Sequence, residues 1–175
     1  MASFTAVVTA RRERLPDDFL AGTIYTSDQT HHSVRKAAVL AGFPEDNVRE
    51  VATNEAYEIR LDDLRRRIAE DREGGLQPFM LVASAGTTNT GAVDDLGGAA
   101  DVAEAEGLWL HVDAAYGGFF MLTERGKESM RGIERADSIV LDPHKGLFLP
   151  YGNGSLLVRD PEALRRAHTT FADYM

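Results

Sequence analysis

Three features of the sequence predict an α/β domain in which helices flank a mainly parallel β-sheet. Short apolar segments alternate with segments of helical periodicity along the chain. The segment PFMLVAS (78–84) is continuously apolar, which is typical of a strand buried on both faces of a parallel sheet. Glycine and proline separate these segments, as at Gly74-Gly75. No internal repeat or linker interrupts the pattern, so we expect one domain or a piece of one.

The expected helices each have a local signal. In 2–12, Phe4, Val7 and Val8 share one face of a helix, and Gly42-Phe43-Pro44 ends the next helix. The segment LDDLRRRIAEDRE has the mixed charge of a solvated helix face, and PEALRRAH carries proline in its first turn. The expected helices are 2–12, 32–40, 61–73, 96–106 and 161–168.

The expected strands are short and apolar, and they fall between those helices. A helical or irregular segment is expected before the fifth strand, from 114 to 137. The expected strands are 23–27, 48–52, 78–84, 108–113, 138–142 and 154–158.

The composition excludes several classes of protein. The chain carries 28 acidic and 19 basic residues, a net charge of −9, which argues against a nucleic-acid or anionic-membrane surface. It has no cysteine, so disulfides, zinc–thiolate sites and cysteine nucleophiles are excluded. No apolar run approaches the roughly 18 residues that a membrane span needs, and no leader pattern begins the chain. We therefore expect a soluble, cytoplasmic protein that binds neither nucleic acid nor membrane.

Polar or small residues follow four of the expected strands. In open α/β sheets, ligands bind beyond the carboxyl ends of the strands, so these positions are candidates for a site. A single polar strand end is equally well explained by the start of a loop, but four together favour a site. The four groups are Ser27-Asp28-Gln29 with His31, Gly86-Thr87-Thr88, Asp113-Ala114-Ala115-Tyr116 and Asp142-Pro143-His144-Lys145.

Lys145 stands inside an otherwise apolar run, where a lysine is rare unless it has a task. A partly desolvated lysine is a usable amine nucleophile toward carbonyl groups. Asp113, at the end of an apolar strand, could hold a cationic nitrogen. A pyridoxal phosphate site needs this pair of residues, a lysine for the aldehyde and an acid for the pyridine nitrogen. Ala115 leaves room for a flat ring, and His31 could cover its other face.

Two other interpretations compete with this one. His111 and Asp113 alternate along a strand and so point to the same side, as metal ligands do. The remaining histidines offer no third ligand at a fixed spacing, so a metal site is less favoured. Alternatively, Lys145 is structural and is paired with a buried acid.

Four ordered motifs resemble the pyridoxal-phosphate-dependent group II amino-acid decarboxylases, the family of aromatic amino-acid and glutamate decarboxylases. They are SDQTHHSVRKAA, ASAGTTNTGAVDDL, HVDAAYGG and DSIVLDPHKG. The resemblance covers essentially all 175 residues. It implies the large domain of a fold type I pyridoxal-phosphate enzyme, and decarboxylation of an L-amino acid to its amine and CO2. It also implies that Lys145 binds the cofactor's aldehyde covalently and that Asp113 pairs with the pyridine nitrogen.

The resemblance implies further roles around the same cofactor. Ala115 would pack beneath the ring and His31 would stack on it as the third catalytic residue. His144 would lie near the phosphate or the reacting carboxylate, and Thr87 near the cofactor's oxygen side. Ser138 fits the family's spacing and is expected to be structural.

The resemblance also bears on what surrounds residues 1–175. It implies that they are the central part of a large domain, with a phosphate-binding turn and a C-terminal small domain outside them, and that the full-length protein is a homodimer. Asp142 and Gly146 depart from residues common in the family, and the substrate amino acid does not follow from the sequence. Transamination, oxidative deamination and a catalytically inert fragment remain alternatives.

Overall fold

A computed structural model describes residues 1–169 of the chain. A six-stranded sheet forms its centre, with strand order β2-β1-β3-β4-β5-β6. Neighbouring strands from β2 to β5 pair in parallel, and β6 pairs antiparallel with β5 at one edge. The strands are β1 (Gly22–Ser27), β2 (Val48–Val51), β3 (Gln77–Ser84), β4 (Trp109–Asp113), β5 (Ser138–Leu141) and β6 (Ser155–Val158). The mainly parallel α/β fold is confirmed.

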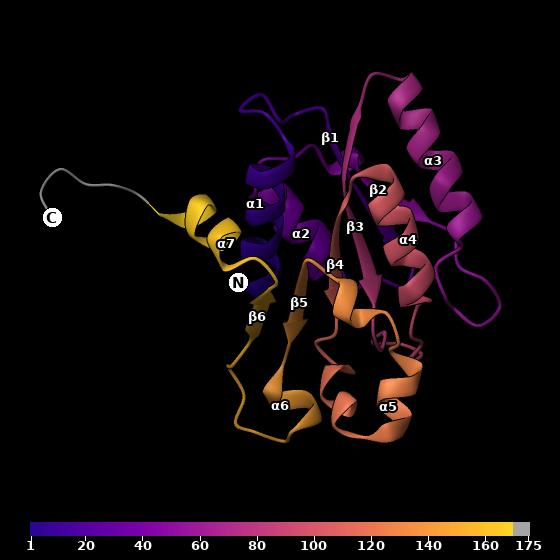
Figure 1. The fold of residues 1–175 in the computed structure, drawn as a ribbon, viewed down its shortest axis with the longest axis vertical. Helices are drawn as coiled ribbons and strands as arrows, with labels where there is room; N and C mark the ends of the chain where they lie inside the picture. Colours follow the sequence, from indigo (N-terminus) through magenta and orange to yellow (C-terminus); the bar gives the residue numbers. More distant parts are fainter. Residues whose placement is uncertain (170–175) are drawn as a thin grey trace, which may run out of the picture.

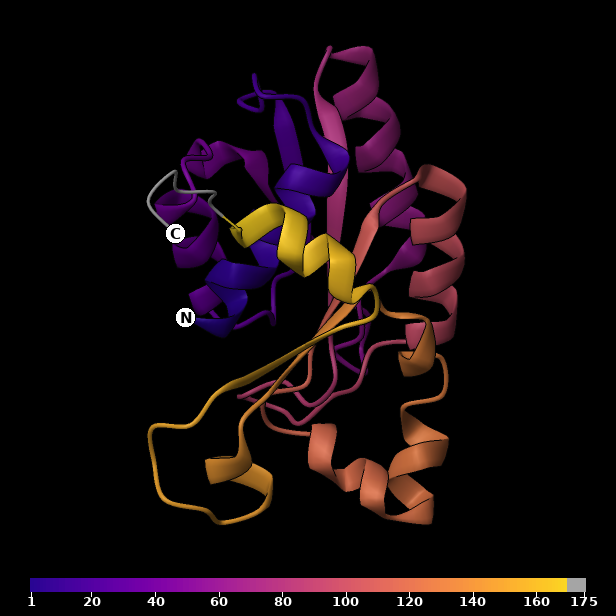
Figure 2. The same cartoon turned by 60° about the vertical axis from the view of Figure 1, so that its left-hand side comes forward.

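Helices cover both faces of this sheet, as Figures 1 and 2 show. One face carries α1 (Ala2–Arg14), α2 (Ser33–Leu40) and α7 (Pro161–His168). The other face carries α3 (Leu61–Glu73) and α4 (Leu96–Glu106). The shorter elements are α5 (Glu124–Ser129), α6 (Pro143–Gly146), η1 (Glu45–Asn47), η2 (Gly118–Leu122) and η3 (Ile133–Arg135).

The apolar run in β3 is explained by this coverage on two sides. Met80 and Val82 pack with the core beneath α1 and α2, whereas Leu81 and Ala83 pack with the core beneath α3 and α4. Alternate residues of a strand point to opposite faces, so a strand covered on both sides has no solvent-facing position to fill with polar residues.

The register of the strands aligns their carboxyl ends. Ser84 at the end of β3 pairs with Asp113 at the end of β4, and Asp113 pairs in turn with Val140 on β5. Figure 1 shows α5 and α6 beyond the arrowheads of β4 and β5, at this same end of the sheet. The loops that follow the strands therefore converge at one edge.

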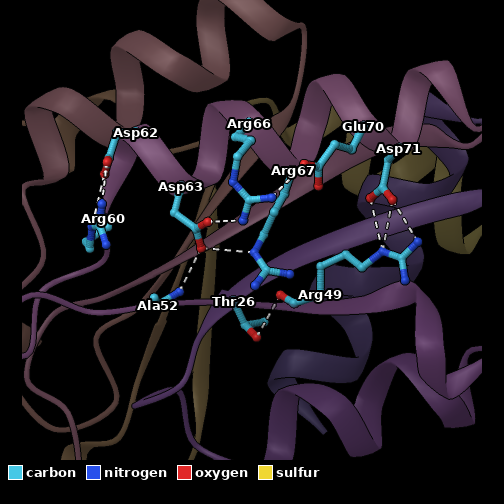
Figure 3. A network of polar contacts seen from close by, with 10 residues as sticks. All are labelled: Thr26, Arg49, Ala52, Arg60, Asp62, Asp63, Arg66, Arg67, Glu70 and Asp71. Carbon is cyan, nitrogen blue, oxygen red and sulfur yellow. Dashed lines mark hydrogen bonds and ion pairs between the residues drawn. The ribbon is translucent and has the colours of Figure 1, made fainter.

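A polar network holds α3 against the β2 edge of the sheet (Figure 3). The Arg49 guanidinium donates to the Asp71 carboxylate, with Nη2 at 2.7 Å from Oδ1. The buried Tyr25 hydroxyl donates to Asp71 Oδ2 at 2.7 Å. Burial is the main cause that raises the pKa of Tyr25. At the other end of α3, Asp63 accepts the Ala52 N–H at 3.1 Å, which ties the start of this helix to the end of β2.

The predicted elements differ from the observed ones mainly at their ends, and the strands differ there by a single residue. The first helix continues to Arg14, two residues beyond the expected range. Residues 143–146, for which the sequence predicted no element, form one turn of helix. The segment 114–137, left open between helical and irregular structure, contains η2, α5 and η3.

Candidate active site

A cavity of about 670 Å³ opens at the carboxyl ends of the strands. Loops that follow β1, β3, β4 and β5 all contribute to its wall, together with the first residues of α1. Six of the lining residues are those expected from the sequence to form a site: His31, Thr87, Asp113, Ala115, His144 and Lys145. The structure thus brings all six residues to one cavity, whereas their individual roles stay predictions.

Lys145 lies on α6, and its Nζ is 3.1 Å from Oδ2 of Asp142, which occupies the N-cap position of this helix without capping it by its side chain. The lysine side chain is 37% exposed, so it is shielded from water only in part, and its role stays a prediction. The apolar residues that follow, Leu147 to Leu149, are themselves exposed because the chain leaves α6 as an open loop. The alternative interpretation was that Lys145 is structural and pairs with a buried acid. Lys145 does pair with an acid, but Asp142 is 19% exposed and also lines the cavity.

Asp113 ends β4 and turns its carboxylate toward the loop that follows. Its Oδ1 accepts the backbone N–H of Ala115 at 3.1 Å. Within residues 1–169 this carboxylate forms no ion pair with a cationic side chain. The second oxygen therefore remains available to a cationic group placed in the cavity.

His31 lies in the turn between β1 and α2, and its ring is held by Ser33. Nδ1 accepts the Ser33 N–H at 3.3 Å and lies 2.8 Å from the Ser33 hydroxyl, an arrangement that leaves the proton on Nε2. Burial and the neighbouring His32 lower the pKa of His31, so the ring is neutral at pH 7. His31 lines the cavity and His32 does not, which agrees with the choice between these adjacent histidines.

His144 and Thr87 reach the cavity with much of their hydrogen-bonding capacity used inside the protein. His144 Nδ1 donates to the Asn153 carbonyl at 2.8 Å. Its Nε2 lies 3.7 Å from Asp142 Oδ2. The Thr87 hydroxyl lies 2.7 Å from that of Thr90 and accepts the Ala92 N–H at 3.2 Å. Both side chains are thereby fixed in position at the cavity wall.

The start of α1 also faces this cavity. Met1, Ala2 and Ser3 line it, and no side chain caps the first turn of the helix. The unpaired N–H groups and the positive end of the helix dipole favour an anion at such a position.

Sequence reasoning missed the contact between Asp142 and Lys145. An Asp-Pro pair at the start of a helix is a recognisable capping signal, and the lysine follows three residues later on the same face. His111, the candidate for a metal site, is instead buried with Nδ1 at 2.8 Å from the Ser138 hydroxyl. No group of three potential ligands is arranged to hold a metal within residues 1–169.

Comparison with known families shows to which family the chain belongs. The profile of the pyridoxal-dependent decarboxylase conserved domain matches residues 9–175. The chain belongs to this family. The prediction made from the four motifs is confirmed, as is the prediction of a fold type I architecture.

Relatives of this pyridoxal-dependent decarboxylase chain match it over nearly all its length. Aromatic-L-amino-acid decarboxylase of Bacillus atrophaeus is 42% identical over 100% of the chain and 36% of the relative. Human cysteine sulfinic acid decarboxylase is 37% identical over 100% of the chain and 37% of the relative. The chain thus spans less than two-fifths of the length of these curated relatives.

Solved structures of decarboxylases superpose closely on the chain. The apo form of mouse CSAD has a TM-score of 0.93 at 36% identity, covering 98% of this chain and 38% of that one. Oryza sativa TDC with PLP and tryptamine has a TM-score of 0.93 at 34% identity, covering 99% of this chain and 37% of that one.

The residues at the cavity fit pyridoxal phosphate, the cofactor of this family. An amine at Lys145 suits its aldehyde, and the available oxygen of Asp113 suits its ring nitrogen. The small side chain of Ala115 leaves space for a flat ring, and the N-terminus of α1 suits a phosphate.

Within residues 1–169, no helix is both long and apolar enough to cross a membrane.

Proposed function

We propose that the intact protein removes CO2 from an L-amino acid and releases the corresponding amine, with pyridoxal phosphate as cofactor. The observation that carries this proposal is the convergence of Lys145 and Asp113 on one cavity at the carboxyl ends of the sheet. Membership of a decarboxylase family supports the same reaction.

Each residue at the cavity has a distinct task in this proposal. The bound cofactor supplies a sink for the electron pair released when the carboxylate bond breaks. Asp113 holds the proton on the ring nitrogen by its negative charge, and Lys145 provides the amine that anchors the aldehyde. The neutral His31 ring stacks on the flat face, and Ala115 leaves the opposite face free. Holding the substrate in the cavity in its reacting orientation lowers the entropic cost of the reaction, and this supplies much of the rate enhancement.

His144 and Thr87 have supporting tasks at the edge of the ring. His144 keeps its Nε2 toward Asp142 while its Nδ1 is held by the Asn153 carbonyl, so the ring offers one fixed polar atom near the phosphate or the reacting carboxylate. Thr87 presents its hydroxyl on the side of the cofactor's ring oxygen. Met1 to Ser3 line the cavity at the positive end of the α1 dipole, which favours the phosphate beside the binding turn expected outside residues 1–175.

We propose further that residues 1–175 belong to the large domain of a cytoplasmic homodimer. Exposed aromatic side chains near the cavity support an interface between subunits, since such residues are usually covered. Phe148 is 93% exposed and Tyr151 is 91% exposed. Light scattering of the intact protein tests this proposal, and a monomer at micromolar concentration contradicts it.

The reaction is tested with the intact protein, added pyridoxal phosphate and a panel of L-amino acids. We expect stoichiometric release of CO2 and of an amine, both abolished in Lys145→Ala. Formation of an aldehyde with ammonia, or of a keto acid without CO2, would assign oxidative deamination or transamination instead. No conversion of any amino acid by protein that holds the cofactor would contradict catalysis altogether.

A further inference from the structure

Three side chains form a buried chain of hydrogen bonds that leads along β4 toward Asp113. The register pairs His111 on β4 with Ser138 on β5. Trp109 Nε1 donates to Ser138 Oγ at 2.8 Å, and Ser138 Oγ lies 2.8 Å from His111 Nδ1. His111 and Ser138 are each 1% exposed and Trp109 is 4% exposed. In this arrangement Nδ1 of His111 is hydrogen-bonded to Ser138, and Nε2 is not.

Proton counting assigns the tautomer of His111. Ser138 Oγ already accepts the Trp109 N–H, and its own hydrogen is free to be donated to His111 Nδ1. The opposite tautomer would leave the serine hydrogen and the Nε2 lone pair both without a partner in the described part of the chain. The ring therefore carries its hydrogen on Nε2. Burial holds the pKa of His111 below its usual value, against the opposing effect of Asp113, so the ring is neutral.

The Nε2 atom of His111 has no hydrogen-bond partner within residues 1–169, although it is fully buried. A buried donor without a partner costs roughly 1–3 kcal/mol, so a single such atom needs a reason. His111 and Asp113 are alternate residues on β4, and their side chains lie on the same face about 6.6 Å apart along the strand. The Asp113 carboxylate has one oxygen bonded to the Ala115 N–H and capacity left on the other.

We infer that His111 is a positioning residue that donates its Nε2–H to the Asp113 carboxylate through one bridging water, and so aims this carboxylate at the pyridine nitrogen of the cofactor. Ser138 fixes the tautomer that makes this donation, and Trp109 fixes Ser138. The inference rests on the proposed function, because it assigns a task toward the proposed cofactor. It also gives Ser138, which the sequence marked only as structural, a place in the support of the site.

The experiment compares two aldehydes bound by the intact protein: pyridoxal 5′-phosphate, and its analogue in which a C–H group replaces the ring nitrogen. Only the first can pair with Asp113. We expect His111→Leu to weaken binding of pyridoxal phosphate about tenfold, the worth of one charge-assisted hydrogen bond, while binding of the analogue changes less than about twofold. His111→Gln places an amide N–H close to the Nε2 position and is expected to restore the affinity.

The same pair of aldehydes separates positioning from packing. Equal weakening of both by His111→Leu would show a packing role only and overturn the inference, as would no weakening of either. If His111→Leu fails to fold, Ser138→Ala replaces it, with the same selective loss expected and the same outcomes overturning. Nitrogen-15 NMR of the ring gives an independent readout, and a hydrogen on Nδ1 overturns the inference.

The controls distinguish this inference from the proposed function. Asp113→Ala must abolish the preference for pyridoxal phosphate over the analogue. If the wild-type protein shows no such preference, or holds neither aldehyde, the proposed function fails and takes the inference with it. If the preference for pyridoxal phosphate is present and is lost in Asp113→Ala but unchanged in His111→Leu, only the inference fails.

Discussion

The amine nitrogen of Lys145 lies 3.1 Å from Oδ2 of Asp142, one turn away on the same short helix. The same oxygen is 3.7 Å from His144 Nε2, so Asp142 contacts both polar residues of α6. The pair is partly exposed, and such a pair contributes little to stability because water screens it. Its consequence is geometric: the carboxylate holds the amine at the cavity wall.

The first prediction concerns the residue that binds the cofactor. Borohydride reduction of the intact protein with bound pyridoxal phosphate is expected to fix the label on Lys145, because this is the lysine that lines the cavity. Peptide mapping locates the label. Lys127→Ala is the matched control, since Lys127 is also partly exposed and also pairs with an acid three residues away, Glu124, at 2.7 Å.

Labelling at Lys36 or Lys127, the other two lysines of the sequence, would contradict the assignment. Lys145→Ala must lose the absorbance of the bound cofactor while Lys127→Ala keeps it. Free aldehydes react with exposed lysines at random, so the reduction is done at one equivalent of cofactor.

The second prediction concerns Asp113. Asp113→Asn keeps the shape of the side chain and an oxygen for the Ala115 N–H, but removes the charge that retains the proton on the ring nitrogen. We expect turnover to fall about a hundredfold or more, which corresponds to a few kcal/mol of barrier. Steady-state CO2 release measures this fall. A variant within about threefold of the wild type would remove Asp113 from the reaction.

Much of the fold was predictable because its signals are local. The ranges 61–73, 96–106 and 161–168 match α3, α4 and α7 in full, since periodicity and stop signals define a helix within its own sequence. The cavity was predictable for a different reason. Parallel strands place their carboxyl ends at one edge, so polar residues after Ser27, Ser84 and Asp113 had to meet there.

The parts that were not predictable depend on long-range contacts or on how a short loop turns. The apolar residues around Lys145 suggest a buried segment, but the chain that follows α6 runs along the surface and leaves Phe148 exposed to solvent. The bond between His111 and Ser138 exists only because β4 and β5 pair in one register. The antiparallel direction of β6 likewise depends on how the chain turns back between β5 and β6, which no periodicity in Ser155–Val158 encodes.

The third prediction concerns the network between β2 and α3. Asp71 is 10% exposed and accepts from both Arg49 and Tyr25. Asp71→Ala leaves the guanidinium and the phenol without their shared partner, and we expect a loss of about 3 kcal/mol in the free energy of unfolding. Urea denaturation followed by circular dichroism measures it. Asp62→Ala, which breaks the exposed pair with Arg60 in the first turn of α3, is the control and is expected to cost less than about 1 kcal/mol.

Tyr25→Phe tests one arm of this network separately. It removes the hydroxyl that donates to Asp71 and lies 3.1 Å from the Thr23 hydroxyl, and the carboxylate keeps its two-nitrogen contact with Arg49. The expected loss is about 1–2 kcal/mol, because two hydrogen bonds of roughly 1 kcal/mol each are removed. A loss in Tyr25→Phe as large as that in Asp71→Ala would show that the phenol, and not the guanidinium, dominates the network.

The last prediction concerns the pH dependence of stability at Asp94. This buried carboxylate accepts the Ile59 N–H on Oδ1 and the Ser84 N–H on Oδ2, each at 2.6 Å, and thereby ties the end of β3 at the cavity to the segment before α3. Burial raises the pKa of Asp94 from its ordinary value of 3.8 to about 6, although both N–H groups act to lower it. A raised pKa means that the folded protein binds the proton more tightly than the unfolded chain. The stability that this proton contributes is therefore fully present below about pH 4 and is lost as the pH rises through about 6.

Asp94→Asn does not titrate, so the free energy of unfolding of the wild type minus that of this variant isolates the effect. We expect the difference to fall by about 2 kcal/mol between pH 4 and 6.5 and to change little above that pH. Asp18→Asn, at an exposed position, is the control and is expected to show no such fall. A constant difference across this range for Asp94→Asn would mean that the two backbone donors outweigh burial and keep the carboxylate ionised.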